Sequence, residues 1–176
     1  MRYWYSILIL LTISCRPDPG HVNMTLGDAT CPIPVDTVYV PVAKDSALPA
    51  RIVAFAKTLI GTPYKFGCTA PATGFDCSGF ITYVFNHFNI DVPRSSVDFT
   101  NEGTPVSLEK ARPGDLILFT GTNSKIRIVG HIGLIVSNDD SGIHFIHSSS
   151  GKENAVMISG LNEGYITRFV KIIRII

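Results

Sequence analysis

The spacing of apolar residues changes along the chain from a helical period to a strand-like one. In residues 49–60, and again from Cys77 to Phe88, apolar side chains recur every three or four positions, which predicts two amphipathic helices. Further along, apolar and β-branched residues gather in short runs separated by turn residues, a pattern typical of strands. These runs cover residues 115–119, 130–136, 143–147, 155–158 and 165–176. Helices followed by strands predict an α+β domain with a mainly antiparallel sheet.

The first residues have the pattern of a secretion signal. They contain one early basic residue, Arg2, and an apolar run from Ile7 to Ile13 that is far shorter than the roughly 20 residues of a membrane-spanning helix. The small residue Ser14 precedes Cys15, and this ending resembles a bacterial lipoprotein signal, in which the cysteine carries the lipid. We therefore expect a lipid anchor at Cys15 and a location in the cell envelope, on a membrane and facing the periplasm or the exterior. Plain secretion is the alternative.

The composition changes again after Cys15. Residues 16–45 are rich in proline and contain only isolated apolar residues, so we expect an extended tether there. The prolines of this segment are Pro17, Pro19, Pro32, Pro34 and Pro41. We expect one folded catalytic domain at residues 46–176, which the tether joins to the signal segment at residues 1–15.

The charge balance argues against a nucleic-acid partner. Lys and Arg together number 15, Asp and Glu number 14, and the net charge is +1, with no block of like charges. Hydrophobic residues make up 45% of the chain and charged residues 16%, which is typical of a globular protein and not of a disordered one. A polyanion is therefore not the expected partner.

One cysteine stands in a setting that favours chemistry. The stretch GFDCSGF places Cys77 at the predicted start of the second helix, between Asp76 and Ser78. Unpaired N–H groups and the positive end of the helix dipole favour a thiolate at such a position. A thiolate is a nucleophile, and the flanking glycines let a substrate backbone approach closely. The alternative is a cysteine that only fills the core, which would leave Asp76 and Ser78 without a role.

A thiol nucleophile needs a base, and three of the five histidines lie in predicted strands: His131, His144 and His147. In the run IHFIH the two histidines are three residues apart, so alternation points them to opposite faces of the strand. If the strands pair, only one of the two points where His131 points. A cysteine at a helix start with two strand histidines is the arrangement of a cysteine protease, namely a nucleophile, a base and a third group that orients the base.

Six motifs in a fixed order resemble one family. They are GTPYKFG, FDCSGF, VPRSS, ARPGDLILF, GHIGLIV and FIHSSS, and they span nearly all of residues 50–176. In this order they resemble the NlpC/P60 family of cell-wall cysteine peptidases. The resemblance implies a papain-like fold and cleavage of peptidoglycan stem peptides or muropeptides between D-glutamate and the diamino acid, through a thioester. It implies neither a metal ion nor a cofactor, and we expect a monomer.

The same resemblance assigns roles to individual residues. Cys77 corresponds to the nucleophile, His131 to the base and His147 to the third member of the site. Contacts with the stem peptide are expected from Tyr64, Asp76, Ser78, Arg94 and Ser95. The connection from Ser137 to Gly142 is longer than the short turn usual in the family, which leaves His144 open as the third member.

Two further cysteines have no assigned role. Cys68 occupies a position where the family usually has glycine, and Cys31 lies in the tether. An oxidising compartment would permit a disulfide between them, and two unpaired cysteines are the alternative.

Three other functions stay open at this point. Cys77, His131 and His147 would suffice for a catalytic zinc site, although no close-spaced ligand pair such as CxxC or HExxH supports one. A catalytically inactive binding module would be expected to lack one of these three residues, and none is missing. An acyltransferase would use the same cysteine and histidine, with an amine in place of water to resolve the thioester.

Overall fold

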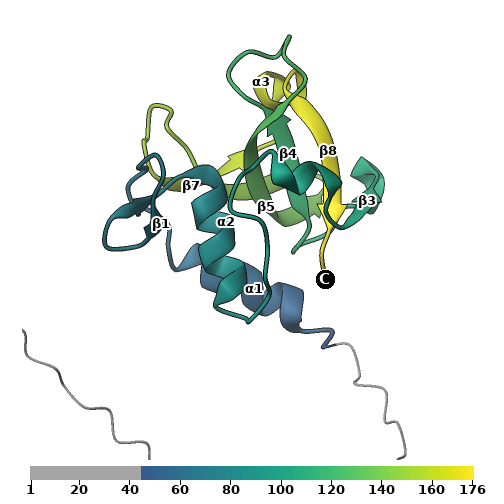
Figure 1. The fold of residues 1–176 in the computed structure, drawn as a ribbon. Coiled ribbons are helices and arrows are strands. Elements are labelled where there is room, and N and C mark those ends of the chain that lie inside the picture. The colour runs from purple at the N-terminus through teal and green to yellow at the C-terminus, as the bar shows by residue number, and fades with distance from the viewer. Residues whose placement is uncertain (1–44) are drawn as a thin grey trace, which may run out of the picture. The chain divides into compact units, whose positions relative to one another are not determined.

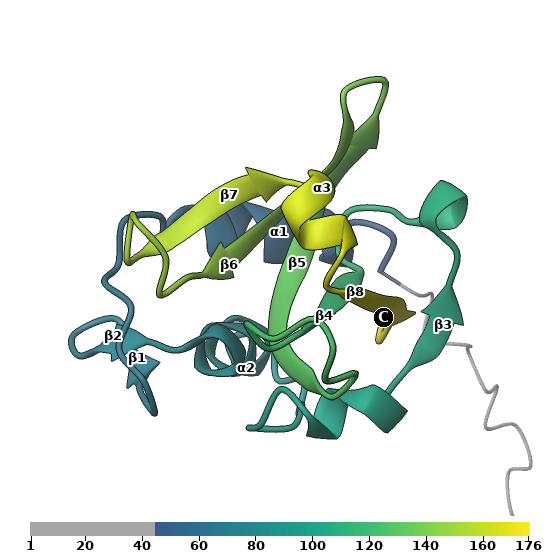
Figure 2. The same cartoon turned by 90° about the horizontal axis from the view of Figure 1, so that it is seen from above.

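A computed structural model describes residues 45–176, so the expected signal segment and nearly all of the expected tether lie outside the described residues. Two helices, α1 (Leu48–Lys57) and α2 (Cys77–Asn86), lie together against one side of an antiparallel sheet (Figure 1). Between them in sequence, β1 (Thr69–Ala70) and β2 (Gly74–Phe75) form a small hairpin beside the start of α2 (Figure 2). Among the described residues, no helix has both the length and the apolar character needed to cross a bilayer.

Within the described residues the main sheet has six strands in the order β3-β8-β4-β5-β6-β7, and every neighbouring pair is antiparallel. The strands are β3 (Thr104–Val106), β4 (Leu116–Thr120), β5 (Val129–Asp139), β6 (Gly142–Ser148), β7 (Val156–Gly160) and β8 (Phe169–Arg174). Three short helices complete the domain: η1 (Asp98–Asn101), η2 (Leu108–Lys110) and α3 (Glu163–Ile166). The predicted α+β class and its mainly antiparallel sheet are confirmed.

The last predicted strand begins later than expected. The run from residue 165 was expected to be extended, but α3 and a turn occupy residues 163–168, and β8 starts only at Phe169. The reason is local, because the side chain of Asn162 accepts a hydrogen bond of 3.2 Å from the N–H of Tyr165 and caps a helical turn.

The predicted long connection between Ser137 and Gly142 is also wrong. Strand β5 continues to Asp139, which pairs with Gly142, so only two residues form the turn. The register shifts once between Ile135 and Ser137, which is a β-bulge that absorbs one extra residue, Val136. The long strands of this hairpin therefore stay paired through the whole segment.

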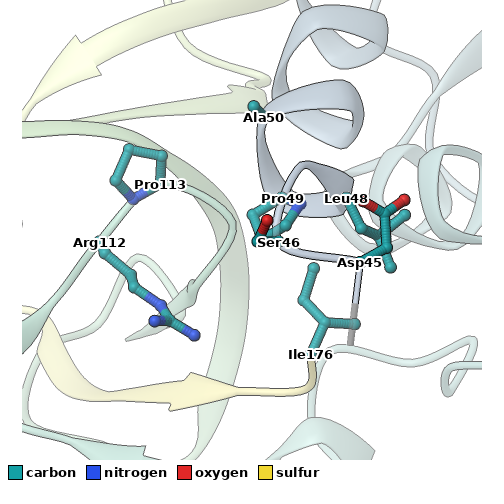
Figure 3. A pocket seen from close by; sticks show the side chains of 8 residues that line it. All are labelled: Asp45, Ser46, Leu48, Pro49, Ala50, Arg112, Pro113 and Ile176. Carbon is teal, nitrogen blue, oxygen red and sulfur yellow. The ribbon is translucent and has the colours of Figure 1, made fainter. Parts of the chain in front are cut away.

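Helix α1 begins at Leu48 and ends at Lys57, three residues before the predicted limit of residue 60. Turns occupy residues 58–61, and the last of these, Gly61, has a φ of +86°. A cavity of about 390 Å³ lies beside the start of α1 and the last residue, Ile176 (Figure 3). Its walls include Pro49 and Pro113 and none of the predicted site residues. This cavity is therefore separate from the site described below.

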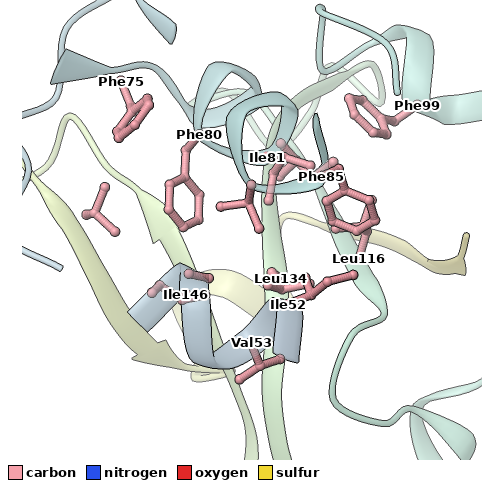
Figure 4. Packing of buried hydrophobic residues seen from close by; sticks show 14 of the residues in the cluster. Ile52, Val53, Phe75, Phe80, Ile81, Phe85, Phe99, Leu116, Leu134 and Ile146 are labelled. Carbon is pink, nitrogen blue, oxygen red and sulfur yellow. The ribbon is translucent and has the colours of Figure 1, made fainter. Parts of the chain in front are cut away.

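The sheet is buried on both faces. In β4, alternation directs Leu116 and Leu118 toward the helices and Ile117 and Phe119 toward the opposite face. Figure 4 shows the helix-facing cluster; its labelled members are Ile52, Val53, Phe75, Phe80, Ile81, Phe85, Phe99, Leu116, Leu134 and Ile146. Burial of each large apolar side chain is worth about 1.5–3 kcal/mol. Strands β5 and β6 contribute to both clusters, so the strands that carry the histidines are firmly packed.

Candidate active site

Cys77 lies at the amino-terminal end of α2, directly after the β1–β2 hairpin. Asp76 is the N-cap of this helix, so the helix begins at the cysteine itself. The sulfur lies 4.0 Å from the carbonyl oxygen of Gly130 and accepts a hydrogen bond from the N–H of Ile132. The thiol therefore rests against the backbone of β5 on both sides of His131.

The surroundings of Cys77 raise the pKa of its thiol. Burial is the main cause, and the negative charge of Asp76 adds to it. The N–H groups of Ser78, Ile132 and Cys77 itself lower the pKa without outweighing these two causes. The N–H groups at the helix start thus favour the thiolate as expected, but their effect is smaller than that of burial, because partial removal from water disfavours the charged form.

His131 on β5 and His147 on β6 lie on the same face of the sheet. Nε2 of His131 is 2.8 Å from Nδ1 of His147, which is the distance of a direct hydrogen bond. His144 points to the opposite face, where its Nδ1 lies 3.4 Å from the hydroxyl of Ser137. Of the two histidines in the strand IHFIH, the structure thus brings His147 to His131, as the resemblance implies.

The ring of His147 is fully buried, with 0% of its surface exposed. Its second nitrogen, Nε2, lies 3.0 Å from the hydroxyl of Ser159 on β7 and 3.4 Å from the hydroxyl of Tyr165 on α3. Both nitrogens of the ring therefore have partners. Sequence reasoning missed Ser159 and Tyr165, since neither belongs to a motif that signals chemistry.

Both imidazoles of the pair have lowered pKa values. For His131 the pKa falls well below 6.5, because of burial first and then the charges of His147 and Arg168. Burial, and then the charge of Arg168, lowers the pKa of His147 to about 4. Both rings are therefore neutral at pH 7, and each carries one N–H and one lone pair.

A glycine on β5 makes room for this pair. A Cβ at Gly133 would lie 2.6 Å from Cδ2 of Phe145 and 3.4 Å from Cβ of His147. A side chain at this position would push β6 side chains out of place. Gly133 lies in the motif GHIGLIV, but only the pairing of β5 with β6 reveals what it must leave free.

Comparison with known proteins gives the family. The model of the NlpC/P60 family matches residues 61–174 of the chain, which is more than half of it. The chain belongs to the NlpC/P60 family. A solved NlpC/P60 family protein from Bacillus cereus is 31% identical with a TM-score of 0.62, and the match covers 72% of this chain and 40% of that one. The fold and the family that the motifs imply are therefore confirmed.

Two curated relatives come from Bacillus subtilis. A gamma-DL-glutamyl hydrolase is 38% identical over 101 residues, or 57% of this chain and 24% of that protein. The probable peptidoglycan endopeptidase LytE is 36% identical over 116 residues, or 66% of this chain and 31% of that protein. The chain thus matches between about a quarter and a third of the length of these relatives.

In this NlpC/P60 domain the carboxylate of Asp76 is fully engaged by the protein. It accepts hydrogen bonds from the N–H groups of Gly67 at 2.8 Å and Gly79 at 2.6 Å. The guanidinium of Arg94 adds two more, at 3.0 and 2.6 Å. Burial raises the pKa of this carboxyl, but the bonds from Arg94 and the two N–H groups outweigh burial and leave the pKa below its usual 3.8.

The other predicted contact residues differ in accessibility. Ser78 is buried, and its hydroxyl lies 3.1 Å from Nη1 of Arg94. Tyr64 is half-buried, and its pKa is raised by burial and then by the charges of Cys77 and Asp76. Ser95 is exposed, and its hydroxyl makes no hydrogen bond among residues 45–176.

Ser148 links the two halves of the site. Its buried hydroxyl donates a hydrogen bond of 2.8 Å to the carbonyl of Phe75, two residues before Cys77. Ser148 directly follows His147 on β6, so this bond ties the strand of the histidine to the hairpin that delivers the cysteine. The motif FIHSSS contains this serine, but its partner lies 73 residues away in sequence.

The described residues hold no group of three or more His, Cys, Asp or Glu side chains arranged to bind a metal ion. In a zinc site built on the histidine pair, the metal would have to replace the direct bond between His131 and His147. Cys68 is half-buried and has no disulfide partner among residues 45–176. The predicted alternative of a disulfide with Cys31 falls outside the described residues.

Proposed function

We propose that this domain is a cysteine endopeptidase that hydrolyses the γ-D-glutamyl–diamino acid amide bond of peptidoglycan stem peptides. The observation that carries the proposal is the placement of the Cys77 thiol against β5 at His131, whose ring is bonded to the buried His147. The names of the relatives, a gamma-DL-glutamyl hydrolase and a probable peptidoglycan endopeptidase, support the same bond class and substrate.

The first step is a proton transfer. Nε2 of His131 is hydrogen-bonded to His147. The lone pair on Nδ1 of His131 is therefore the one that accepts the proton of Cys77. The thiol and the imidazole both start neutral, since the pKa of the thiol is raised and that of the ring is lowered. We therefore infer that the proton moves as the sulfur attacks, and that no ion pair stands ready beforehand.

Acyl transfer follows from this. The sulfur of Cys77 bonds to the γ-carbonyl carbon, and the oxyanion accepts a hydrogen bond from the N–H of Cys77, with the phenol of Tyr64 as a second donor. The imidazolium of His131 then protonates the amine of the diamino acid, which leaves as the C–N bond breaks. In the second half, His131 takes a proton from water, the hydroxide attacks the thioester, and the thiol is released.

The stem peptide would meet the exposed residues next to the thiol. Arg94 and Ser95 are exposed and Tyr64 is half-exposed, so these side chains are able to reach a ligand. Asp76 and Ser78 are buried and hold the Arg94 guanidinium. In this proposal Asp76 and Ser78 act on the peptide mainly through Arg94.

The remaining parts of the proposal concern the whole protein. A lipid on Cys15 would hold the enzyme on a membrane of the cell envelope, where its partners would be stem peptides or muropeptides. We propose that it acts as a monomer without metal or cofactor.

Mass spectrometry of products tests the reaction. The protein is incubated with intact sacculi and with a free tripeptide stem, and new ends between D-glutamate and the diamino acid are sought. Cys77→Ala should abolish product, and iodoacetamide should inhibit while a chelator should not. Products coupled to an added amine would indicate an acyltransferase, and full activity of Cys77→Ala would overturn the mechanism.

A further inference from the structure

We propose that Ser159 and Tyr165 are positioning residues that accept the Nε2–H of His147 and thereby keep Nδ1 of His131 free to take the proton of Cys77. This inference rests on the proposed function and extends the site beyond its three motif residues. It comes from the arrangement of four side chains on three strands and one short helix: β5, β6, β7 and α3.

Hydrogen counting leads to this assignment. A neutral imidazole carries one N–H, so a free Nδ1 on His131 requires that its Nε2 carries the proton and donates it to Nδ1 of His147. The single N–H of His147 is then on Nε2. Two oxygens lie within reach of that N–H, the hydroxyl of Ser159 at 3.0 Å and that of Tyr165 at 3.4 Å. Ser159 is the closer and main acceptor.

Burial makes these acceptors necessary. The ring of His147 has 0% of its surface exposed, so water does not supply a substitute. Without both hydroxyls the N–H at Nε2 would be buried and unpaired, and an unpaired buried N–H is costlier than an unpaired lone pair. His147 would then favour the other tautomer, with its proton on Nδ1. Nε2 of His131 would then have to accept a hydrogen bond from that N–H. The single N–H of His131 would lie on Nδ1, the side needed for Cys77.

The fold holds both hydroxyls in place. Ser159 pairs with Phe145 across β6 and β7 and therefore shares the face of His147. The ring of Tyr165 packs edge-on against Phe145, with ring centroids 4.9 Å apart, and lies 5.2 Å from the ring of Phe119. Such packing aims the phenol at His147 and gives α3 a function that no local pattern indicates.

Kinetics of the full-length protein give the first test. We expect Ser159→Ala to lower kcat about tenfold and Tyr165→Phe about threefold, and the double variant about 30-fold or more, each with KM nearly unchanged. Ser159→Thr keeps the hydroxyl and should recover most of the rate. Ser137→Ala is the matched control, because Ser137 stands in the same relation to His144 on the opposite face, and its kcat should stay within about twofold of the parent.

Nitrogen chemical shifts of the imidazoles give a second test that needs no turnover. In ring-labelled Cys77→Ala protein, we expect His131 as the Nε2–H tautomer with an unprotonated Nδ1, and a shift toward Nδ1–H when Ser159→Ala and Tyr165→Phe are added. An Nδ1–H tautomer of His131 in the presence of both hydroxyls would overturn the inference. So would unchanged tautomers and rates in the double variant.

The two proposals fail in different ways. If Cys77 proves dispensable for turnover, the proposed function falls while the tautomer measurement still decides the role of Ser159. If the double variant does not fold, Ser159→Ala compared with Ser159→Thr decides it, since a tenfold loss restored by threonine supports the inference and equal rates overturn it.

Discussion

At the residue scale, the chemistry depends on which nitrogen of each imidazole is engaged. His131 has its Nε2 bonded to His147, and the second nitrogen of His147 is bonded to hydroxyls. Burial lowers the pKa of both rings and raises the pKa of the Cys77 thiol, and both shifts favour the neutral forms in the proposed mechanism. Charge develops only during attack, when the N–H groups around the sulfur and the oxyanion can stabilise it.

A neutral starting state predicts a broad pH range of activity. Burial disfavours the imidazolium of His131, so its pKa lies well below 6.5 and the base stays unprotonated in mild acid. Burial also disfavours the thiolate, so the pKa of Cys77 lies above 9.0. We expect kcat/KM to stay level between pH 6.5 and 9.0, and the rate of alkylation of Cys77 by iodoacetamide to have its inflection above 9.0. Rapid alkylation that is already level at about pH 5–7 would instead indicate a thiolate–imidazolium pair.

The two histidines of β6 should differ in their effect on rate. His147→Ala should lower kcat by about 10- to 1,000-fold, less than His131→Ala does, because an orienting group supports the base without replacing it. His147→Asn or His147→Gln should recover part of the loss, since an amide oxygen accepts the bond from His131. His144→Ala, on the opposite face, should leave kcat nearly unchanged. A larger loss from His144→Ala than from His147→Ala would contradict the assignment of the third member.

At the element scale, the start of α2 depends on one carboxylate. Asp76 caps the helix, accepts a hydrogen bond from the N–H of Gly67 in the preceding loop and forms an ion pair with Arg94. Three segments therefore meet at this group, directly beside Cys77. A substitution here should affect stability as well as any substrate contact.

Asp76→Ala should lower the free energy of unfolding by about 2–4 kcal/mol, because it removes a helix cap and leaves the buried N–H of Gly79 unpaired. Urea denaturation measures the loss. Asp91→Ala is the control, since Asp91 is exposed and should change stability by less than about 0.5 kcal/mol. If Asp76→Ala raises KM but leaves the denaturation midpoint of the parent, Asp76 is a substrate contact and not a structural group.

The contact between β5 and β6 depends on the absence of a side chain at Gly133. Gly133→Ala should cost about 1–3 kcal/mol of stability and lower kcat about tenfold or more, because its Cβ would lie 2.6 Å from Phe145 and displace the side chains around His147. Gly121→Ala is the control, since a Cβ there meets nothing within 4 Å and its φ is not positive. Equal kcat values and melting temperatures for the two variants would contradict this prediction, because they would show that β6 adjusts to the added Cβ with no loss of rate or stability.

At the scale of the whole molecule, residues 45–176 bring together two halves of a site from distant parts of the chain. The helix-facing cluster seats α2 on the sheet, and the bond from Ser148 to Phe75 joins the histidine strand to the cysteine hairpin. A site of this kind forms only when the whole domain is folded. In our proposal, its place in the cell depends on Cys15, which lies outside this domain.

The lipid anchor proposed at Cys15 predicts where the protein is found. With Cys15 intact, the protein should fractionate with membranes, and Cys15→Ala should release it or leave the signal uncleaved. Immunoblotting of membrane and soluble fractions measures both outcomes, with Cys68→Ala as the control that should stay in the membrane fraction. Recovery of the unaltered protein in the soluble fraction would favour plain secretion.

Local patterns were sufficient for much of the fold. Period and turn residues are properties of neighbouring residues, so they predicted α1, the start of α2 and the strands that carry His131 and His147. They failed at residues 165–168, where the side chain of Asn162 closes a helical turn. They also failed at residues 137–142, where the turn residues predict a long connection but a bulge keeps the two strands paired.

The sequence by itself determined the family, the fold class and the three residues of the candidate site, because motif order and residue type are written along the chain. The tertiary structure alone decided which atoms meet. His147 reaches His131 because β5 and β6 pair in one register, and Ser159 and Tyr165 reach His147 because β7 and α3 pack beside it. The raised pKa of the Cys77 thiol likewise depends on the fold, since burial is a property of the packed domain and outweighs the local effect of the helix start.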